Sequence, residues 1–326
     1  MNIALKFLMH CAWGLFYAVM LPAAHAQQKV MQIEDSRELA MSVAIADVHM
    51  HAVDRSVEFH KAQMDRNRVQ WGGGVGPAGR NADAAALRTA LGSRYFYALG
   101  QEAFSAVFGS AGEPGLVDPE HPAFVALFAT ADEMLRTRQA YGFGELHIDN
   151  SRTYSSPQFA RKVPFDNPVV RRIYEIANRH GAVIQFHMEA DEQEIAELKS
   201  YLLEFPNSKT LLSHGLGYSR QPLLRRLLSE HPNLYLELSR KGAVLNHKVA
   251  GQAFTAEDGP KHFWLKTIEQ FPDRFMIGSD SHYPDEEKYD EVMREFRTGL
   301  FPYLQPATLR KVAHENAVRV FGLQGQ

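Results

Sequence analysis

Residues 43–51 read VAIADVHMH and decide the fold assignment, because they join a short apolar strand to two histidines two positions apart. Side chains of a β-strand alternate between its two faces, so His49 and His51 lie on one face and can reach one ion. The apolar residues before them are typical of a strand buried on both faces of a parallel sheet. The stretch therefore predicts a parallel α/β fold with a metal site at a strand end.

The same arrangement recurs further along the chain, where apolar runs lead into polar side chains. In parallel α/β folds the C-terminal ends of the strands meet at one edge, and binding sites form there. A buried, unpaired His or Asp would cost several kcal/mol, so core packing does not explain these residues. The predicted strands with the groups that follow them are Ala182–Phe186 with His187, Lys209–Ser213 with His214, Leu234–Leu238, and Arg274–Gly278 with Asp280.

Amphipathic helices are predicted between these strands. Asn167 and Pro168 suit the N-cap and first position of a helix, and Gly181 suits its C-terminal cap. A second pattern of helical period begins at Pro222, and a third covers Thr308–Phe321. The alternation predicts a single (β/α)8 barrel of the TIM type with its site at the C-terminal ends of the strands. A doubly wound open sheet is the alternative.

The composition excludes several classes of protein. The chain has 326 residues, of which 45% are hydrophobic and 22% charged, so disordered and collagen-like chains are excluded. With 35 Lys and Arg against 38 Asp and Glu, the formal net charge is −3. This charge gives no overall positive field for nucleic acid or an anionic membrane, and we expect no nucleic-acid partner. A mean hydropathy of −0.30 excludes a polytopic membrane protein.

The first 26 residues have the features of a secretory signal peptide. Lys6 supplies a positive charge, Phe7–Leu21 is mostly apolar, and Ala24–Ala26 has the small-x-small pattern of a cleavage site. We expect cleavage after Ala26 and a periplasmic or secreted mature protein without stable membrane association. An uncleaved anchor is the alternative, although the apolar run is short for a span of about 20 residues.

This assignment divides the chain into three parts. Residues 1–26 are the signal peptide, 27–42 an N-terminal extension, and 43–326 the barrel. The only cysteine, Cys11, lies in the signal peptide. The mature chain therefore has no thiolate, and histidines and carboxylates must hold any metal ion.

Five motifs occur in order along the chain: Asp47–His51, His187, His214, Gly278–Asp280 and the C-terminal Glu315–Leu323. Together they resemble the amidohydrolase-related family (amidohydrolase 2 type) of the metal-dependent amidohydrolase superfamily. The resemblance covers residues 43–323 and implies a (β/α)8 barrel with one divalent metal, usually zinc. It also implies that His49, His51, His187 and Asp280 hold the metal, and that His214 activates the substrate or the attacking water.

The residue types suit this chemistry without the resemblance. Imidazoles and a carboxylate suit zinc, with manganese as the alternative, and either ion lowers the pKa of a bound water toward about 7. Asp280 can contact the metal and accept the proton of the water, and His214 can act as general acid or base or as an oxyanion donor. We expect hydrolysis of an amide, ester or lactone in a small molecule.

Other activities remain as alternatives at this point. The resembled family contains decarboxylases as well as hydrolases, so non-oxidative decarboxylation at the same site is the main alternative. A third possible function is that of a phosphodiesterase or DNase with two metal ions. The remaining alternative is a binding protein without catalytic activity. A homodimer also remains open, because family members often dimerise.

Glu145 has two interpretations. It lies in GFGELH, residues 142–147, which we expect to be the end of the fourth strand. Members of the superfamily with two metals place a bridging carboxylate or a modified lysine at this strand end. Glu145 therefore either bridges a second ion, or it supports the first site or contacts the substrate.

Four further residues are candidates for substrate binding. His147 and His282 each lie two positions after a carboxylate of the predicted site, so they are expected to line its mouth. Arg152 and Arg240 follow the fourth and seventh strands, where a guanidinium could bind a carboxylate group of the substrate.

Overall fold

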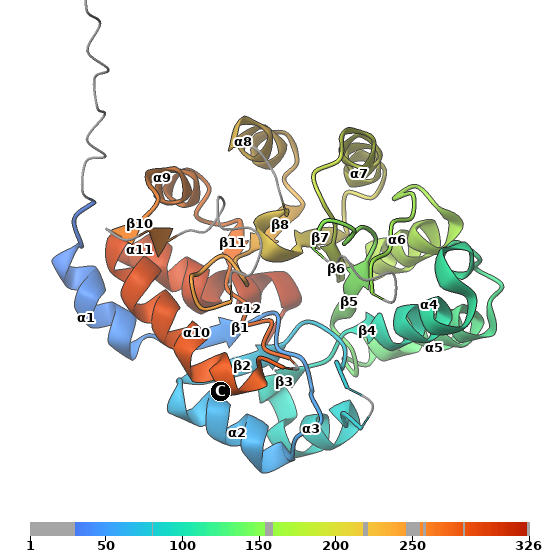
Figure 1. Ribbon diagram of the computed structural model, residues 1–326, viewed down its shortest axis with the longest axis horizontal. Helices are drawn as coiled ribbons and strands as arrows, with labels where there is room; N and C mark the ends of the chain where they lie inside the picture. The colour runs from blue at the N-terminus through green and yellow to red at the C-terminus, as the bar shows by residue number, and fades with distance from the viewer. Residues whose placement is uncertain are drawn as a thin grey trace, which may run out of the picture.

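The structure is a computed structural model that describes residues 30–79, 81–153, 159–217, 221–245, 255–256, 259–282 and 284–324. Its centre is a parallel sheet, and helices lie around it (Figure 1). The strands of this sheet are β1 (Ile45–Asp47), β2 (Val69–Gly73), β3 (Tyr95–Phe96), β4 (Leu99–Gly100), β5 (Gly142–His147), β6 (Val183–His187), β7 (Lys209–Leu212), β8 (Leu234–Glu237) and β11 (Phe275–Met276).

The sheet closes into a barrel. One ladder has the order β1-β2-β3, and the other has the order β11-β8-β7-β6-β5-β4, with all neighbours parallel. β3 and β4 belong to one stretch, residues 95–100, which joins the two ladders. A parallel bridge between Asp47 and Ile277 joins β1 to the strand that contains β11. An open doubly wound sheet would have two free edges, so the prediction of a (β/α)8 barrel is confirmed.

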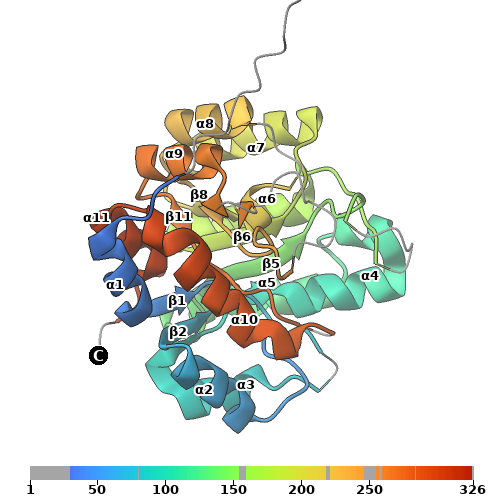
Figure 2. The ribbon, with the colours of Figure 1, turned by 60° about the vertical axis from the view of Figure 1, so that its left-hand side comes forward.

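Helices follow the strands in sequence and pack on the outside of the barrel (Figure 2). A short antiparallel pair, β9 (Thr255–Ala256) and β10 (Gly259–Pro260), lies before α9. The helices are α1 (Glu34–Ser42), α2 (Val57–Arg66), α3 (Ala84–Leu91), α4 (Gln101–Leu116), α5 (Pro122–Arg136), α6 (Pro168–His180), α7 (Glu192–Glu204), α8 (Gln221–Glu230), α9 (His262–Gln270), α10 (Tyr289–Glu295), α11 (Pro306–Arg310) and α12 (Asn316–Phe321).

The helices predicted from sequence are present, and α6 has the caps predicted for it. The side chain of Asn167 accepts hydrogen bonds from the amides of Val169 and Val170, both at 3.0 Å, and so begins α6. Gly181 ends the same helix in the left-handed region, with φ 59°. The predicted C-terminal helix is present as α11 and α12, which a π-helical turn at Lys311–Glu315 connects.

Alternate residues of the strands face the inside of the barrel, and on three strands they run from an apolar residue to a polar one at the C-terminal end. The lower, apolar residues form one buried cluster with Val320 and Phe321 of α12, which therefore closes the N-terminal end of the barrel. The upper residues lead into the candidate site. The inward series of three strands are Val183, Gln185 and His187; Tyr235, Glu237 and Ser239; and Met276, Gly278 and Asp280.

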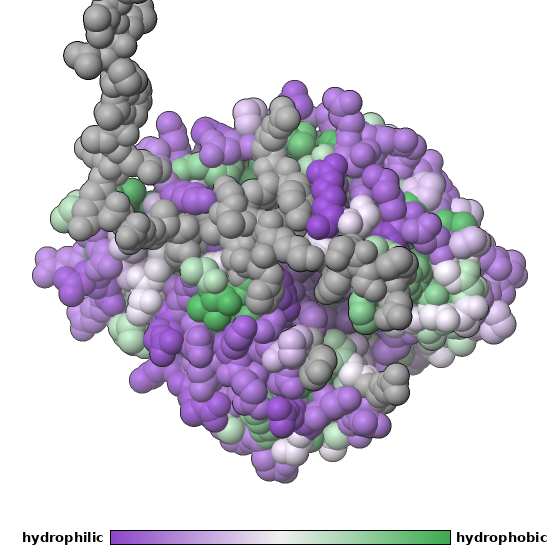
Figure 3. Space-filling view, viewed as in Figure 1, coloured by the Kyte–Doolittle hydropathy of each residue, from purple (hydrophilic) through white to green (hydrophobic). Residues whose placement is uncertain are grey.

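The predicted signal peptide and its cleavage site lie outside the described residues and stay predictions. Of the N-terminal extension, α1 packs on the C-terminal part of the chain, where Ser36 Oγ donates to the carbonyl of Leu304 at 2.6 Å. No helix among the described residues is long and apolar enough to cross a membrane. On the face shown in Figure 3, hydrophilic residues cover most of the coloured surface.

Arg297 fastens α1 to the barrel. Its buried guanidinium donates to the carbonyls of Ala40, Val43 and Asn67, at 2.6, 3.1 and 2.8 Å. These carbonyls belong to the end of α1, the segment before β1, and the segment before β2. One side chain therefore satisfies three carbonyl groups that lie far apart in sequence.

We expect Arg297→Met to lower the free energy of unfolding by about 3 kcal/mol, because each carbonyl that loses its donor costs about 1 kcal/mol or more. Urea unfolding of the full chain measures this change. Arg310→Met is the control, because Arg310 is exposed and its guanidinium donates to the carbonyl of Pro306 in its own helix. Equal losses in the two variants would show that Arg297 does not fasten α1.

Candidate metal centre

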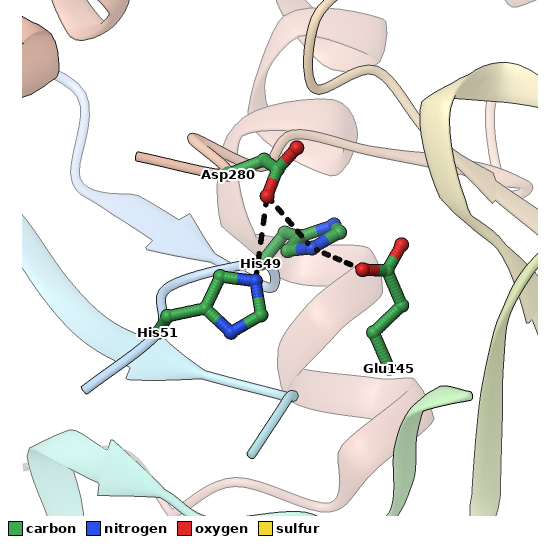
Figure 4. A group of neighbouring side chains, drawn as sticks. All are labelled: His49, His51, Glu145 and Asp280. Carbon is green, nitrogen blue, oxygen red and sulfur yellow. Dashed lines mark ion pairs between the residues drawn. The ribbon is translucent and has the colours of Figure 1, made fainter. Parts of the chain in front are cut away.

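Four side-chain donor atoms converge at the C-terminal end of the barrel (Figure 4). His49 Nε2 lies 3.3 Å from Asp280 Oδ1 and 3.4 Å from Glu145 Oε2, and His51 Nε2 lies 3.3 Å from Asp280 Oδ1. Ligands placed tetrahedrally about 2.0–2.1 Å from a zinc ion are about 3.3–3.4 Å apart. The spacing of these atoms therefore fits one metal ion.

Hydrogen bonds on the far side of each imidazole aim its Nε2 atom into this group. His49 Nδ1 donates to Glu237 Oε1 at 3.0 Å, and His51 Nδ1 donates to the carbonyl of Gly76 at 2.8 Å. Such bonds fix the tautomer and leave the lone pair on Nε2. His49 Nε2 is buried and has no hydrogen-bond partner among the described residues, as expected of an atom that binds a metal.

Glu145 faces a second group of donors with its other oxygen. Oε1 lies 3.3 Å from His187 Nδ1 and 3.3 Å from His214 Nε2, and these two nitrogens are 3.1 Å apart. We expected His187 to complete the ligand set of His49, His51 and Asp280. In the structure Glu145 lies close to His49, His51 and Asp280, and His187 lies with His214 beside the other oxygen of Glu145. That His187 holds the metal stays a prediction.

The charges of the site favour a cation. Burial raises the pKa of Asp280, but Arg240 and His49 outweigh it and hold that pKa well below its usual range. Burial likewise opposes ionisation of Glu145, yet neighbouring histidines lower its pKa well below the ordinary value. Burial lowers the pKa of His49, but Glu145 and Asp280 raise it well above normal. The two carboxylates are therefore ionised at neutral pH, and a divalent cation could take the place of the proton that they favour on His49.

Asp47 connects the first and last strands directly below the site. Its Oδ1 accepts the amide of His49 at 3.1 Å and the amide of Ser279 at 2.9 Å. The amide of Asp280 donates to the carbonyl of His49 at 2.8 Å, which holds the two donor residues side by side. The sequence alone left open whether Asp47 supports the candidate site or only ends a strand, and the structure shows that it joins the turns that carry His49 and Ser279.

The two candidate arginines already pair with carboxylates. Arg240 Nε donates to Asp280 Oδ2, and its Nη2 donates to the carbonyl of Asp280 at 2.9 Å. Arg152 Nε lies 3.1 Å from Glu189 Oε2. Arg240 therefore orients Asp280 so that Oδ1 faces the histidines. That either arginine binds a substrate carboxylate stays a prediction.

The two candidate histidines lie beside the carboxylates of the site, and their contact with a substrate stays a prediction. His147 Nε2 is 2.9 Å from Glu145 Oε2, and His282 Nε2 is 3.5 Å from Asp280 Oδ1. Burial lowers the pKa of His147 to about 4, although Glu145 acts in the opposite direction. His147 is therefore neutral at neutral pH and can donate a hydrogen bond to Glu145.

Glu237, Ser239 and Gln185 belong to the site although no sequence motif indicated them. Glu237 is fully buried, and it appeared in the sequence only as part of an apolar strand. The alternation of side chains along that strand could have indicated it, because Glu237 lies two positions from both Tyr235 and Ser239 and therefore points into the barrel with them. Gln185, oriented so that all its partners are satisfied, accepts from His49 Nδ1 at 3.1 Å.

We expect Asp47→Ala to lower the free energy of unfolding by about 2–4 kcal/mol, because two buried amides lose their acceptor. The same change should reduce the metal content of the purified protein, because the turns that carry His49 and Asp280 would separate. Urea unfolding and elemental analysis measure the two effects. Asp47→Asn is the matched control and keeps an acceptor oxygen, so an equal loss in that variant would contradict this role of Oδ1.

Solved structures of other proteins share this fold. A putative 2-pyrone-4,6-dicarboxylic acid hydrolase from Pseudomonas putida is 16% identical, with a TM-score of 0.56 over 87% of this chain and 99% of that one. A dihydroorotase from Campylobacter jejuni is 14% identical, with a TM-score of 0.54 over 87% and 85%. A 2,6-dihydroxybenzoate decarboxylase is 11% identical, with a TM-score of 0.50 over 87% and 99%. At these identities the likeness concerns the fold alone.

The sequence itself places the chain in a family. No curated protein matches it significantly. The family described as amidohydrolase matches residues 10–323, which is nearly the whole chain and includes every residue of the site. The match agrees with the resemblance seen in the sequence motifs and with the barrel found in the structure. This chain belongs to the amidohydrolase family.

Proposed function

We propose that this protein is a metal-dependent hydrolase of a small carbonyl compound, an amide, ester or lactone. The observation that carries the proposal is the group of four donor atoms from His49, His51, Glu145 and Asp280, which are spaced as ligands of one ion. Two imidazoles and two carboxylates suit zinc, with manganese as the alternative. When bound, such an ion would polarise a carbonyl and lower the pKa of a water.

His214 is the residue we propose for proton transfer. Its Nδ1 donates to Ser239 Oγ at 2.8 Å, which leaves the lone pair of Nε2 facing the site. Burial lowers the pKa of His214, so the ring is neutral and can accept a proton at neutral pH. Asp280 offers Oδ1 to the site, and Arg240 already donates to Oδ2. This arrangement supports Asp280 as a ligand that acts together with His214.

The two carboxylate oxygens of Glu145 support the proposal of a second metal ion. One oxygen faces His49, and the other faces His187 and His214, as a bridging carboxylate would. Two ions would also be compatible with a phosphodiesterase or DNase. We favour a small-molecule substrate over nucleic acid, because the net charge of −3 provides no general attraction for a polyanion.

Decarboxylation at the same site is the alternative reaction. One solved structure with this fold is named as a decarboxylase, and others are named as hydrolases. Both reactions need a polarised carbonyl and a positioned proton donor or acceptor. The fate of water and the release of CO2 therefore distinguish them better than the geometry does.

We also propose, from the sequence alone, that the protein works in the periplasm or outside the cell after cleavage behind Ala26. The mature chain would then not associate stably with the membrane. A homodimer is compatible with this proposal. N-terminal sequencing of the exported protein and its mass in solution would test these points.

We expect the purified protein to contain about one equivalent of zinc or manganese, and His49→Ala to lose it, because His49 contacts both carboxylates of the group. About two equivalents, falling to one in Glu145→Gln, would instead indicate bridged ions. Elemental analysis gives these values. His180→Ala is the control, because His180 pairs with Asp132 outside the site. A wild-type protein that holds no metal even after reconstitution would exclude the proposed function.

We expect His214→Asn to lower kcat by at least about 100-fold, as loss of a general acid or base does. The fold and one equivalent of metal should remain. Turnover in ¹⁸O-labelled water checks the reaction, because hydrolysis places the label in the product and decarboxylation releases CO2 instead. An active His214→Asn variant would contradict the role of His214 in both reactions.

A further inference from the structure

We propose that Glu237 is a positioning residue shared by the metal ligand His49 and the proton-transfer residue His214, and that Ser239 connects it to His214. The hydrogen bonds that carry this inference are independent of the reaction, but its kinetic consequences rest on the proposed function. Glu237 ends β8 and lies behind both histidines, so it contacts them from outside the group of metal donors.

Four hydrogen-bond donors converge on the buried carboxylate of Glu237. Oε1 accepts from His49 Nδ1 at 3.0 Å, from the amide of His214 at 2.8 Å and from Ser239 Oγ at 2.9 Å. Oε2 accepts from the amide of Ser239 at 2.6 Å. Only a group that accepts at both ends can satisfy them. In a glutamine one of these two oxygens would be replaced by an NH2 group. Whichever way the amide is turned, that NH2 group would then face hydrogen-bond donors and not acceptors.

The hydroxyl of Ser239 fixes the tautomer of His214. Glu237 can only accept, so the single proton of Ser239 Oγ points at its carboxylate. The hydroxyl must then accept from His214 Nδ1, which lies at 2.8 Å. Nδ1 therefore carries the proton, and Nε2 is unprotonated toward Glu145. Without the serine hydroxyl, Nδ1 would lose this acceptor while Nε2 would still face Glu145 Oε1 at 3.3 Å, so the preference for a proton on Nδ1 would be lost.

The same carboxylate holds His49 more directly than Ser239 does. His49 Nδ1 lies 3.0 Å from Glu237 Oε1 but 3.4 Å from Ser239 Oγ. The rings of His49 and His214 stack with their centroids 5.4 Å apart, so one buried group aligns both. Loss of Glu237 should therefore affect the metal ligand and the proton acceptor, whereas loss of the Ser239 hydroxyl should affect only the second.

The packing around Glu237 leaves little freedom to move. A Cβ atom at Gly278 would lie 2.6 Å from Glu237 Oε2 and 2.5 Å from the Cβ of His49. Gly278 is the inward residue of the last strand just before Asp280. Glycine is required here because the carboxylate and the imidazole approach the strand backbone so closely. Gly278→Ala therefore displaces Glu237 and His49 without removing a polar group.

The test compares Glu237→Gln, Ser239→Ala and the double variant, each made in the full chain. ¹⁵N NMR of the histidine rings in metal-free protein reports the tautomer of His214, whose signals are assigned with His214→Asn. Competition with a chromophoric chelator measures zinc affinity, and steady-state kinetics separates kcat from KM. Glu194→Gln is the matched control, because Glu194 on α7 is also buried but pairs with Lys162, outside the site.

In Ser239→Ala we expect a mixture of His214 tautomers, unchanged zinc affinity and unchanged KM, with kcat at least about tenfold lower. In Glu237→Gln we expect zinc binding about 10- to 100-fold weaker as well as a lower kcat. Because Ser239 acts through Glu237, the double variant should lose no more kcat than Glu237→Gln alone. Should Glu237→Gln fail to fold, Gly278→Ala takes its place and should weaken zinc binding.

A single Nδ1–H tautomer of His214 in Ser239→Ala would overturn the proposal, as would wild-type zinc affinity in folded Glu237→Gln. Additive losses of kcat in the double variant would overturn it too. A wild-type protein that binds zinc but hydrolyses no carbonyl compound would refute the proposed function only. The tautomer and zinc measurements would then still decide the role of Glu237.

Discussion

Side chains of a β-strand alternate between two faces, and in a closed barrel one of these faces points into a shared interior. The same inward series therefore builds the core at one end of the strands and the site at the other. On β8 the series runs from Tyr235, which packs in the apolar cluster, to Glu237 and Ser239, which hold the histidines. The position of the site follows from where each series changes from apolar to polar.

The charge of the site follows from this geometry. The interior of the barrel excludes water, so the carboxylates of Glu145, Glu237 and Asp280 must find partners within the protein. Histidine rings and Arg240 supply some of these partners, but His49 Nε2 and Glu145 Oε1 lack hydrogen bonds in the described part of the chain. A cation held by the group of four donors would bind His49 Nε2, whereas Glu145 Oε1 faces His187 and His214 on the other side of the carboxylate.

Precision at the site depends on residues that do not belong to the group of metal donors. Asp47 holds the turns of His49 and Ser279 together, and Arg240 binds one oxygen of Asp280 so that the other faces the histidines. Glu237 orients His49 from behind. Each of these contacts is a charge-assisted hydrogen bond to a buried group, which restrains orientation more strongly than packing alone does.

The sequence by itself determined the barrel, the helix that begins at Asn167, and the strand ends that carry His49, His214 and Asp280. These features depend on local period, capping and the order of motifs, which neighbouring residues already specify. Only the tertiary structure decided that Glu145 joins the group of His49, that Arg240 binds Asp280, and that Glu237 serves two histidines. Glu237 and His49 are 188 residues apart, and closure of the barrel alone brings such residues together.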